Sequence, residues 1–73
     1  MQHAVIEARA HAFRQRALQA DAKASRVEIP DATRRAWLIV ARDWYRMAEQ
    51  EDAKLAQEQV AQLMARLRRI VSL

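Results

Sequence analysis

The stretch that decides the fold is "RRAWLIVARDWYRMAEQEDAKLAQEQVAQLMARLRRIVSL", residues 34–73. It contains neither glycine nor proline, so nothing in it is expected to interrupt a helix. As a single helix it would be about 60 Å long, at roughly 1.5 Å per residue. The part of the chain that precedes it is too short to cover that length. The sequence therefore predicts a long helix, half of which has no neighbour within the same chain.

The composition predicts a single all-α domain over residues 1–73. The chain has sixteen alanines and many Arg, Gln, Glu and Leu residues, which are strong helix formers. It has no glycine and no asparagine, on which the tight turns of small β-sheet domains depend. We expect a helix over about residues 2–25, a turn over about 26–30 and a second helix over about 31–71. A short connection of this kind favours an antiparallel helical hairpin.

Apolar residues in the first segment recur at alternating spacings of four and three, which is typical of a helical packing seam. They are Ile6, Ala10, Phe13, Ala17, Ala20 and Ala24. Four of these six side chains are alanines, and alanine buries little area. We therefore expect large side chains on the opposite helix.

The second segment starts near Pro30, because proline suits the first turn of a helix. Its seam consists of Trp37, Ala41, Trp44 and Ala48. Antiparallel pairing places Trp37 opposite Ala20 and Trp44 opposite Phe13, so we expect both tryptophans to be buried between the helices. The predicted hairpin core is Ile6, Ala10, Phe13, Ala17, Ala20, Trp37, Ala41, Trp44 and Ala48. Val27 and Ile29, in the turn, are expected to fold inward and close the end of the hairpin.

Beyond Ala48 the apolar seam shifts by five residues and continues in a new register. It then consists of Ala53, Ala56, Val60, Leu63, Leu67 and Ile70. Antiparallel pairing leaves no intrachain helix beside residues after about Ala56, although large aliphatic side chains, Leu73 included, are densest there. A contiguous apolar face of this kind usually marks an interface. The predicted interface residues are Ala56, Val60, Leu63, Met64, Leu67, Ile70 and Val71.

We expect a second copy of the chain to cover this face, forming a coiled-coil or four-helix-bundle homodimer. Acidic residues gather at one end of the segment and basic residues at the other. The acidic ones are Glu49, Glu51, Asp52 and Glu58, and the basic ones are Arg66, Arg68 and Arg69. An antiparallel pair with a two-fold axis near residues 60–62 brings opposite charges together, whereas a parallel pair stacks like charges.

Few residues could carry catalysis or hold a cofactor. The chain has no cysteine, no glycine-rich phosphate loop, two serines and one threonine, so we expect no enzyme activity and no cofactor. His3, Glu7 and His11 are spaced four residues apart, but they drift around the helix and lack a fourth ligand, so no metal site is predicted. Glu51 and Asp52 are expected to lie in a solvated acidic patch.

The charge pattern leaves two alternatives to a protein partner open. Thirteen basic and nine acidic residues give a net charge of +4, and the two signs are interspersed. Solvated outer faces explain the basic stripes best. Binding of nucleic acid through these stripes is one alternative, and peripheral membrane binding through the amphipathic C-terminal helix is another. The stripes are Arg9, Arg16 and Lys23 on the first helix, and Arg35, Arg42 and Arg46 on the second.

The expected location is cytoplasmic, because neither a secretory signal nor a stretch of roughly 18 apolar residues is present. The leading expectation for function is a small self-associating interaction protein, an adaptor or regulator without catalytic activity.

Residues 13–50, "FRQRALQADAKASRVEIPDATRRAWLIVARDWYRMAEQ", resemble a loose group of short helical-hairpin proteins found chiefly in proteobacteria. These proteins have an arginine-rich first helix that ends in alanines, a turn with Asp-Pro, and a second helix with an Arg–apolar–Ala–Trp–Leu-Ala-Glu pattern. Corresponding positions here are Phe13, Arg14, Arg16, Ala17, Ala20, Pro30, Arg34, Leu38, Ala41, Trp44, Met47, Ala48 and Glu49. Ile29 replaces the usual aspartate before the proline. The resemblance covers about half of the chain and implies a helical hairpin, but no activity.

Overall fold

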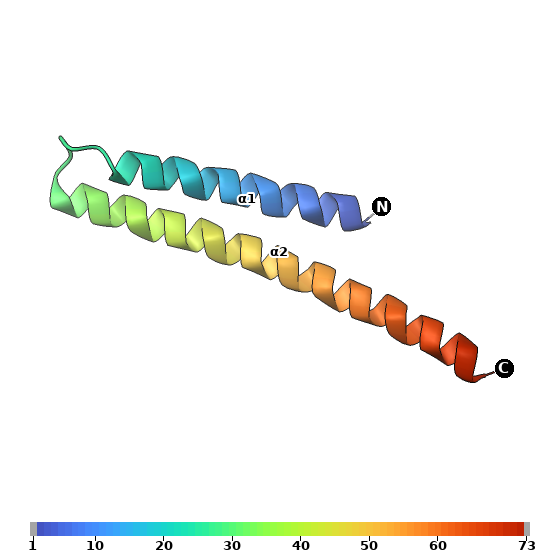
Figure 1. Cartoon of the computed structure of the whole chain (residues 1–73). Coiled ribbons are helices and arrows are strands. Elements are labelled where there is room, and N and C mark those ends of the chain that lie inside the picture. The colour runs from blue at the N-terminus through green and yellow to red at the C-terminus, as the bar shows by residue number, and fades with distance from the viewer. Residues whose placement is uncertain (1, 73) are drawn as a thin grey trace.

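The computed structural model describes residues 2–72, which form two helices and no strand. Helix α1 spans Gln2–Ala24 and helix α2 spans Asp31–Val71. The helices run antiparallel, and the N-terminus of α1 lies past the middle of α2, so only the C-terminal part of α2 projects beyond it (Figure 1). The result is a rod with extents of 67 × 18 × 12 Å. The predicted all-α helical hairpin is confirmed.

The turn between the helices is held by polar contacts rather than by an apolar plug. The Ser25 hydroxyl donates a hydrogen bond to the Asp21 carbonyl at 3.0 Å, and the Arg34 guanidinium donates one to the Arg26 carbonyl at 2.9 Å. Ile29 is half-buried, but Val27 is 91% exposed, so the expectation that it folds inward is wrong. Ala24 is buried and Ile29 is half-buried at this end of the hairpin, so the apolar contacts there are made without Val27.

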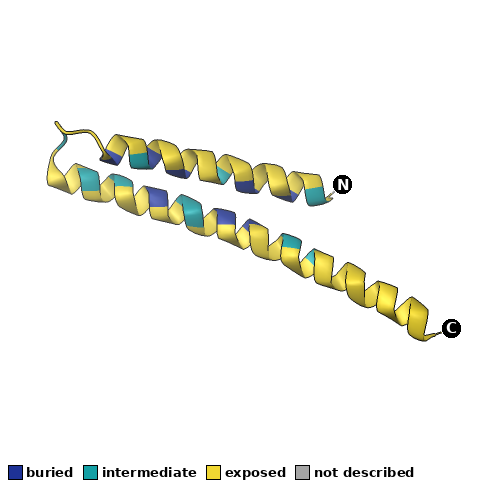
Figure 2. Ribbon diagram, viewed as in Figure 1, coloured by how far each residue is buried: buried dark blue, intermediate teal, exposed yellow. Residues whose placement is uncertain are grey.

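The two helices meet through a seam of small side chains. The buried apolar residues are Ile6, Ala10, Ala17, Ala20 and Ala24 of α1 and Ala41 and Ala48 of α2 (Figure 2). Six of these seven are alanines, and Ala10 and Ala17 are 0% exposed. Full burial of a side chain this small requires the opposite backbone to come close. The hairpin core is therefore thin, and it depends on a short distance between the helices.

The large aromatic side chains lie beside this seam, not within it. Phe13, Trp37 and Trp44 are half-buried, so the expectation that both tryptophans are buried between the helices is wrong. Phe13 stacks on Trp44 with ring centroids 5.6 Å apart. The outer ring faces are covered by cations, with Arg16 4.8 Å from the Trp44 centroid and Lys23 Nζ 4.3 Å from that of Trp37. An indole is too large for the narrow gap that the alanines set, so it packs along the edge under a basic side chain.

Enlarging one alanine of the seam tests the close contact. We expect Ala17→Leu to destabilise the hairpin by about 1–3 kcal/mol, because the added atoms force the helices apart. The matched control is Ala22→Leu, since Ala22 is exposed on the same helix, and it should change stability by no more than about 0.5 kcal/mol. Urea unfolding followed by circular dichroism at one protein concentration measures both. Equal stabilities would contradict a close alanine seam.

Candidate functional site

The strongest candidate site is the apolar face on the part of α2 that extends past α1. We call it the C-terminal stripe; it consists of Ala53, Ala56, Val60, Leu63, Leu67 and Ile70, flanked by Met64 and Val71. All eight residues are exposed (Figure 2). Leu63 is 56% exposed, Leu67 54% and Val71 82%. Leu73, which the sequence pattern adds to this region, lies outside the described residues.

The stripe is exposed because of both the length and the phase of α2. Helix α2 has 41 residues and α1 has 23, and Leu55 and Glu58 are the last residues of α2 with even half-buried side chains. The five-residue shift after Ala48 also turns the apolar residues away from the side that faces α1. Burial of one large aliphatic side chain contributes roughly 1.5–3 kcal/mol, so several left in water together indicate an interface.

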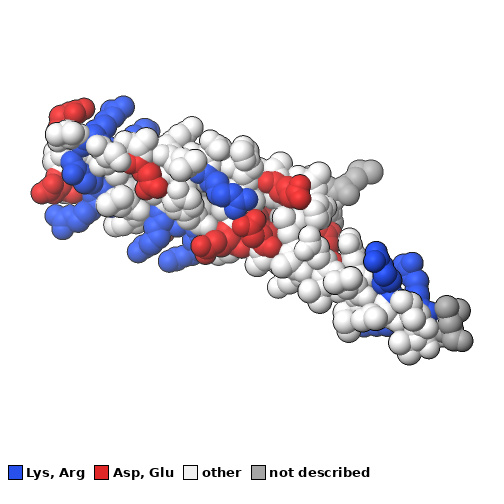
Figure 3. Space-filling view, in the orientation of Figure 1, with Lys and Arg blue, Asp and Glu red and all other residues white. Residues whose placement is uncertain are grey.

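Charged side chains border the stripe at both ends. Figure 3 shows acidic side chains close to the N-terminal end of α1 and basic side chains near the C-terminal end of α2. The surface between these two groups is uncharged. Glu49, Asp52 and Glu58 belong to the acidic end. Arg66, Arg68 and Arg69 belong to the basic end, and all three are exposed. The two ends of the candidate site therefore have opposite charge.

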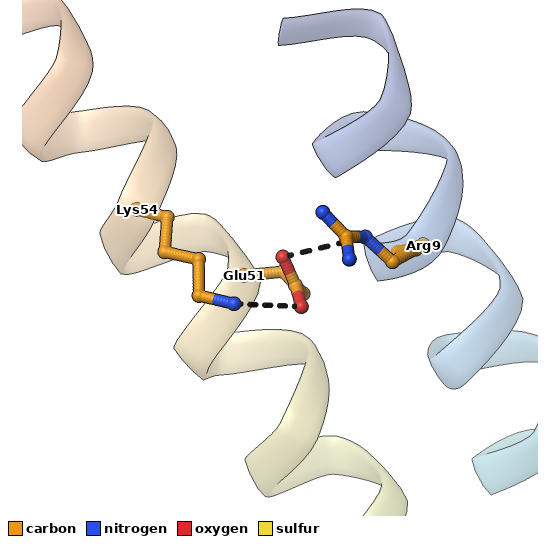
Figure 4. A network of polar contacts seen from close by, with 3 residues as sticks. All are labelled: Arg9, Glu51 and Lys54. Atoms are coloured by element: carbon orange, nitrogen blue, oxygen red, sulfur yellow. Dashed lines mark hydrogen bonds and ion pairs between the residues drawn. The ribbon is translucent and has the colours of Figure 1, made fainter. Parts of the chain in front are cut away.

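Glu51 is a buried carboxylate on the side of α2 that faces α1 (Figure 4). Its Oε1 lies 3.1 Å from Lys54 Nζ and its Oε2 lies 3.9 Å from Arg9 Nε. The residue is only 6% exposed, so the expectation of a solvated Glu51 is wrong. Glu51 follows Ala48 by three residues, so it lies on the same side of α2, the side that faces α1. Burying a charge is costly even when it is paired, and the alanine seam therefore ends here.

A second polar side of the hairpin carries longer-range contacts between α1 and α2. Arg14 Nη1 lies 2.8 Å from Asp52 Oδ2, and the Tyr45 hydroxyl donates a hydrogen bond to Asp21 Oδ2 at 3.2 Å. Burial raises the pKa of the Tyr45 phenol, and the hydrogen bond and the negative charge of Asp21 raise it further. These contacts fix the alignment of α1 along α2, and so determine how much of α2 extends beyond α1.

An open groove of about 410 Å³ lies along this side. Its lining is Asp21, Leu38, Ala41, Arg42, Tyr45, Arg46 and Glu49. Two acidic and two basic side chains line it together, so it favours neither anions nor cations.

The histidines do not assemble into a larger polar site. His3 Nε2 lies 2.8 Å from Glu7 Oε1, and His11 is exposed. Among residues 2–72, no group of three or more His, Cys, Asp or Glu side chains is placed to hold a metal ion. Sequence reasoning found the stripe but missed the Glu51 pairing and the contact between Tyr45 and Asp21, since neither follows from apolar periodicity.

No protein-family model, curated protein or solved structure matches this chain. Neither helix, over the described residues, is long and apolar enough to cross a membrane.

The titration of Tyr45 tests the polar side of the hairpin. Tyr45 is the only tyrosine, so tyrosinate absorbance follows it alone. We expect its pKa to lie above the ordinary value of about 10, and Asp21→Asn to lower it, because the variant removes the negative charge. The neutral phenol is favoured in the folded state. Its contribution to stability is therefore present below the unfolded pKa and is lost as the pH rises through the folded one.

The control is Asp43→Asn, which removes an exposed carboxylate that pairs with Arg42. It should leave the Tyr45 titration unchanged. An unshifted titration in the wild-type chain would show that Tyr45 and Asp21 do not meet in solution.

Proposed function

We propose that this chain is a small self-associating interaction protein, an adaptor or regulator that forms a symmetric homodimer through the C-terminal stripe. The observation that supports the proposal is the exposure of all eight residues of the stripe and its flanks, although α1 lies beside the start of the stripe. An isolated helix of this size gains little from backbone hydrogen bonding alone in water, and packing of its apolar face supplies most of its stability. The stripe is therefore the surface on which α2 needs a partner.

A second copy of the chain suits the stripe better than an unrelated helix. In a two-fold contact the same patch is used twice, and symmetric dimers are the commonest oligomers. The stripe is uncharged between its two ends, so two copies can meet there without burying a charged side chain. The spacing of its six central residues alternates between three and four, which is the spacing that interlocking helices require.

The charges at the ends of the stripe favour an antiparallel arrangement. Two antiparallel copies place the acidic end, with Asp52 and Glu58, beside the partner's basic end, with Arg66 and Arg68. A parallel arrangement places arginines beside arginines and carboxylates beside carboxylates. Each exposed pair contributes at most about 1 kcal/mol, but several pairs acting together decide the orientation.

Size-exclusion chromatography with light scattering tests the proposal. We expect the wild-type chain to be a dimer at micromolar concentration. The double variant Leu63→Asp with Leu67→Asp should be a monomer, because it places charges in the middle of the stripe. The matched control is Gln62→Asp with Ala65→Asp, which adds the same charges to exposed positions on the other side of α2 and should remain dimeric.

A wild-type monomer at micromolar concentration would contradict the proposal. The exposed stripe would then be available to a different protein or to an anionic membrane surface. Loss of the dimer in the control variant as well would show that added charge, and not the stripe, controls association.

A further inference from the structure

We infer that the two copies pair in one register, with the two-fold axis between residues 61 and 62, to form an elongated dimer. This inference rests on the proposed homodimer and adds the alignment of its helices. The stripe starts at Ala53 and stops at Ile70, and its midpoint lies between Ala61 and Gln62. A two-fold axis at the midpoint lets each copy cover the full stripe of the other.

This register pairs side chains of complementary size. Ala53 lies opposite Ile70 of the partner subunit, Ala56 opposite Leu67 of the partner subunit, and Val60 opposite Leu63 of the partner subunit. By symmetry the same three pairs occur again on the other side of the axis. Each layer thus joins a larger aliphatic side chain to a smaller one, which fills the space between two helices without crowding it.

A shift of seven residues in either direction loses this fit. If each copy is shifted by seven residues toward the hairpin of the other, Glu49 lies opposite Leu67 of the partner subunit. That position would bury a charged carboxylate in an apolar layer, which costs free energy even when basic side chains lie nearby. Moving them the other way places Ala53 and Ala56 beyond Ile70, the last stripe residue of the partner subunit, and shortens the contact between the two stripes. One register therefore uses the whole stripe and buries no charge.

Two copies of α2 paired in this register leave room for α1. Arg9 contacts Glu51 and Arg14 contacts Asp52, so the first turns of α1 lie beside the start of the stripe. The stripe residues Ala53 and Ala56 are nevertheless exposed, which leaves room for the end of a second α2 next to α1. Three helices would meet at each end of the stripe, with only the two copies of α2 in the middle. The two hairpins do not overlap, so the dimer is elongated and is not a four-helix bundle.

The register sets where charges from the two copies meet. Arg66, Arg68 and Arg69 of the partner subunit lie closest to positions 57, 55 and 54, between Asp52 and Glu58. The basic end of one copy therefore lies within the acidic end of the other.

Distances between spin labels on single introduced cysteines test the register, since the chain has no cysteine of its own. Ala61→Cys and Gln50→Cys are suitable sites because both residues are exposed and lie outside the stripe. Along the helix axis we expect about 1.5 Å between the two labels at position 61 and about 35 Å between those at position 50, at roughly 1.5 Å per residue. Light scattering on each labelled variant should still show a dimer.

Each other result overturns the inference in a distinguishable way. Short distances at both positions would indicate a parallel dimer, which refutes the register but leaves self-association intact. An antiparallel dimer shifted by seven residues changes the separation at position 50 by about 10 Å in either direction. A monomer with no dipolar coupling at either position, supported by light scattering, would refute the proposed function together with the register.

Discussion

Close contact between alanines of α1 and α2 is the constraint on which the other features of this structure depend. Six of the seven buried apolar residues are alanines, so the helices must approach closely to exclude water between them. The short distance moves Phe13, Trp37 and Trp44 to the edges of the seam, where Arg16 and Lys23 cover the two indoles. The same contact stops at Glu51, where a charge replaces an alanine.

The change of phase in α2 separates two contact surfaces on one continuous helix. Up to Glu51 the buried residues of α2 face α1, whereas the residues of the C-terminal stripe, from Ala53 onward, lie on another side. A longer α1 would therefore not cover the C-terminal stripe, because it would run along a different side of α2. In the proposed dimer, intrachain packing and association use separate faces, so association does not need the hairpin to open.

The sequence alone predicts the helices and their faces, but not the distance between them. Absence of glycine and the spacing of Ile6, Ala10 and Ala17 are enough to predict α1 and its buried side. Periodicity says which side of a helix is buried and nothing about how close the next helix comes, so it could not place Trp37 at the edge. The charge of Glu51 predicts a solvated position, but its place three residues after Ala48 buries it against α1. The stripe was predictable, since exposure follows from chain length.

The thin core links the folding of α2 to its association. A hairpin that buries mainly alanines gains little from apolar burial, and small domains of this size have a narrow margin of stability. The largest aliphatic side chains of the chain, such as Leu63, Leu67 and Ile70, are exposed in the single chain. Their burial in the proposed dimer would stabilise the C-terminal part of α2, which α1 does not reach. Since a partner that binds the folded state stabilises it by mass action, the helicity of this part would then rise with protein concentration. In the proposed dimer, the part of α2 that forms the interface is thus also the part whose helical structure depends most on association.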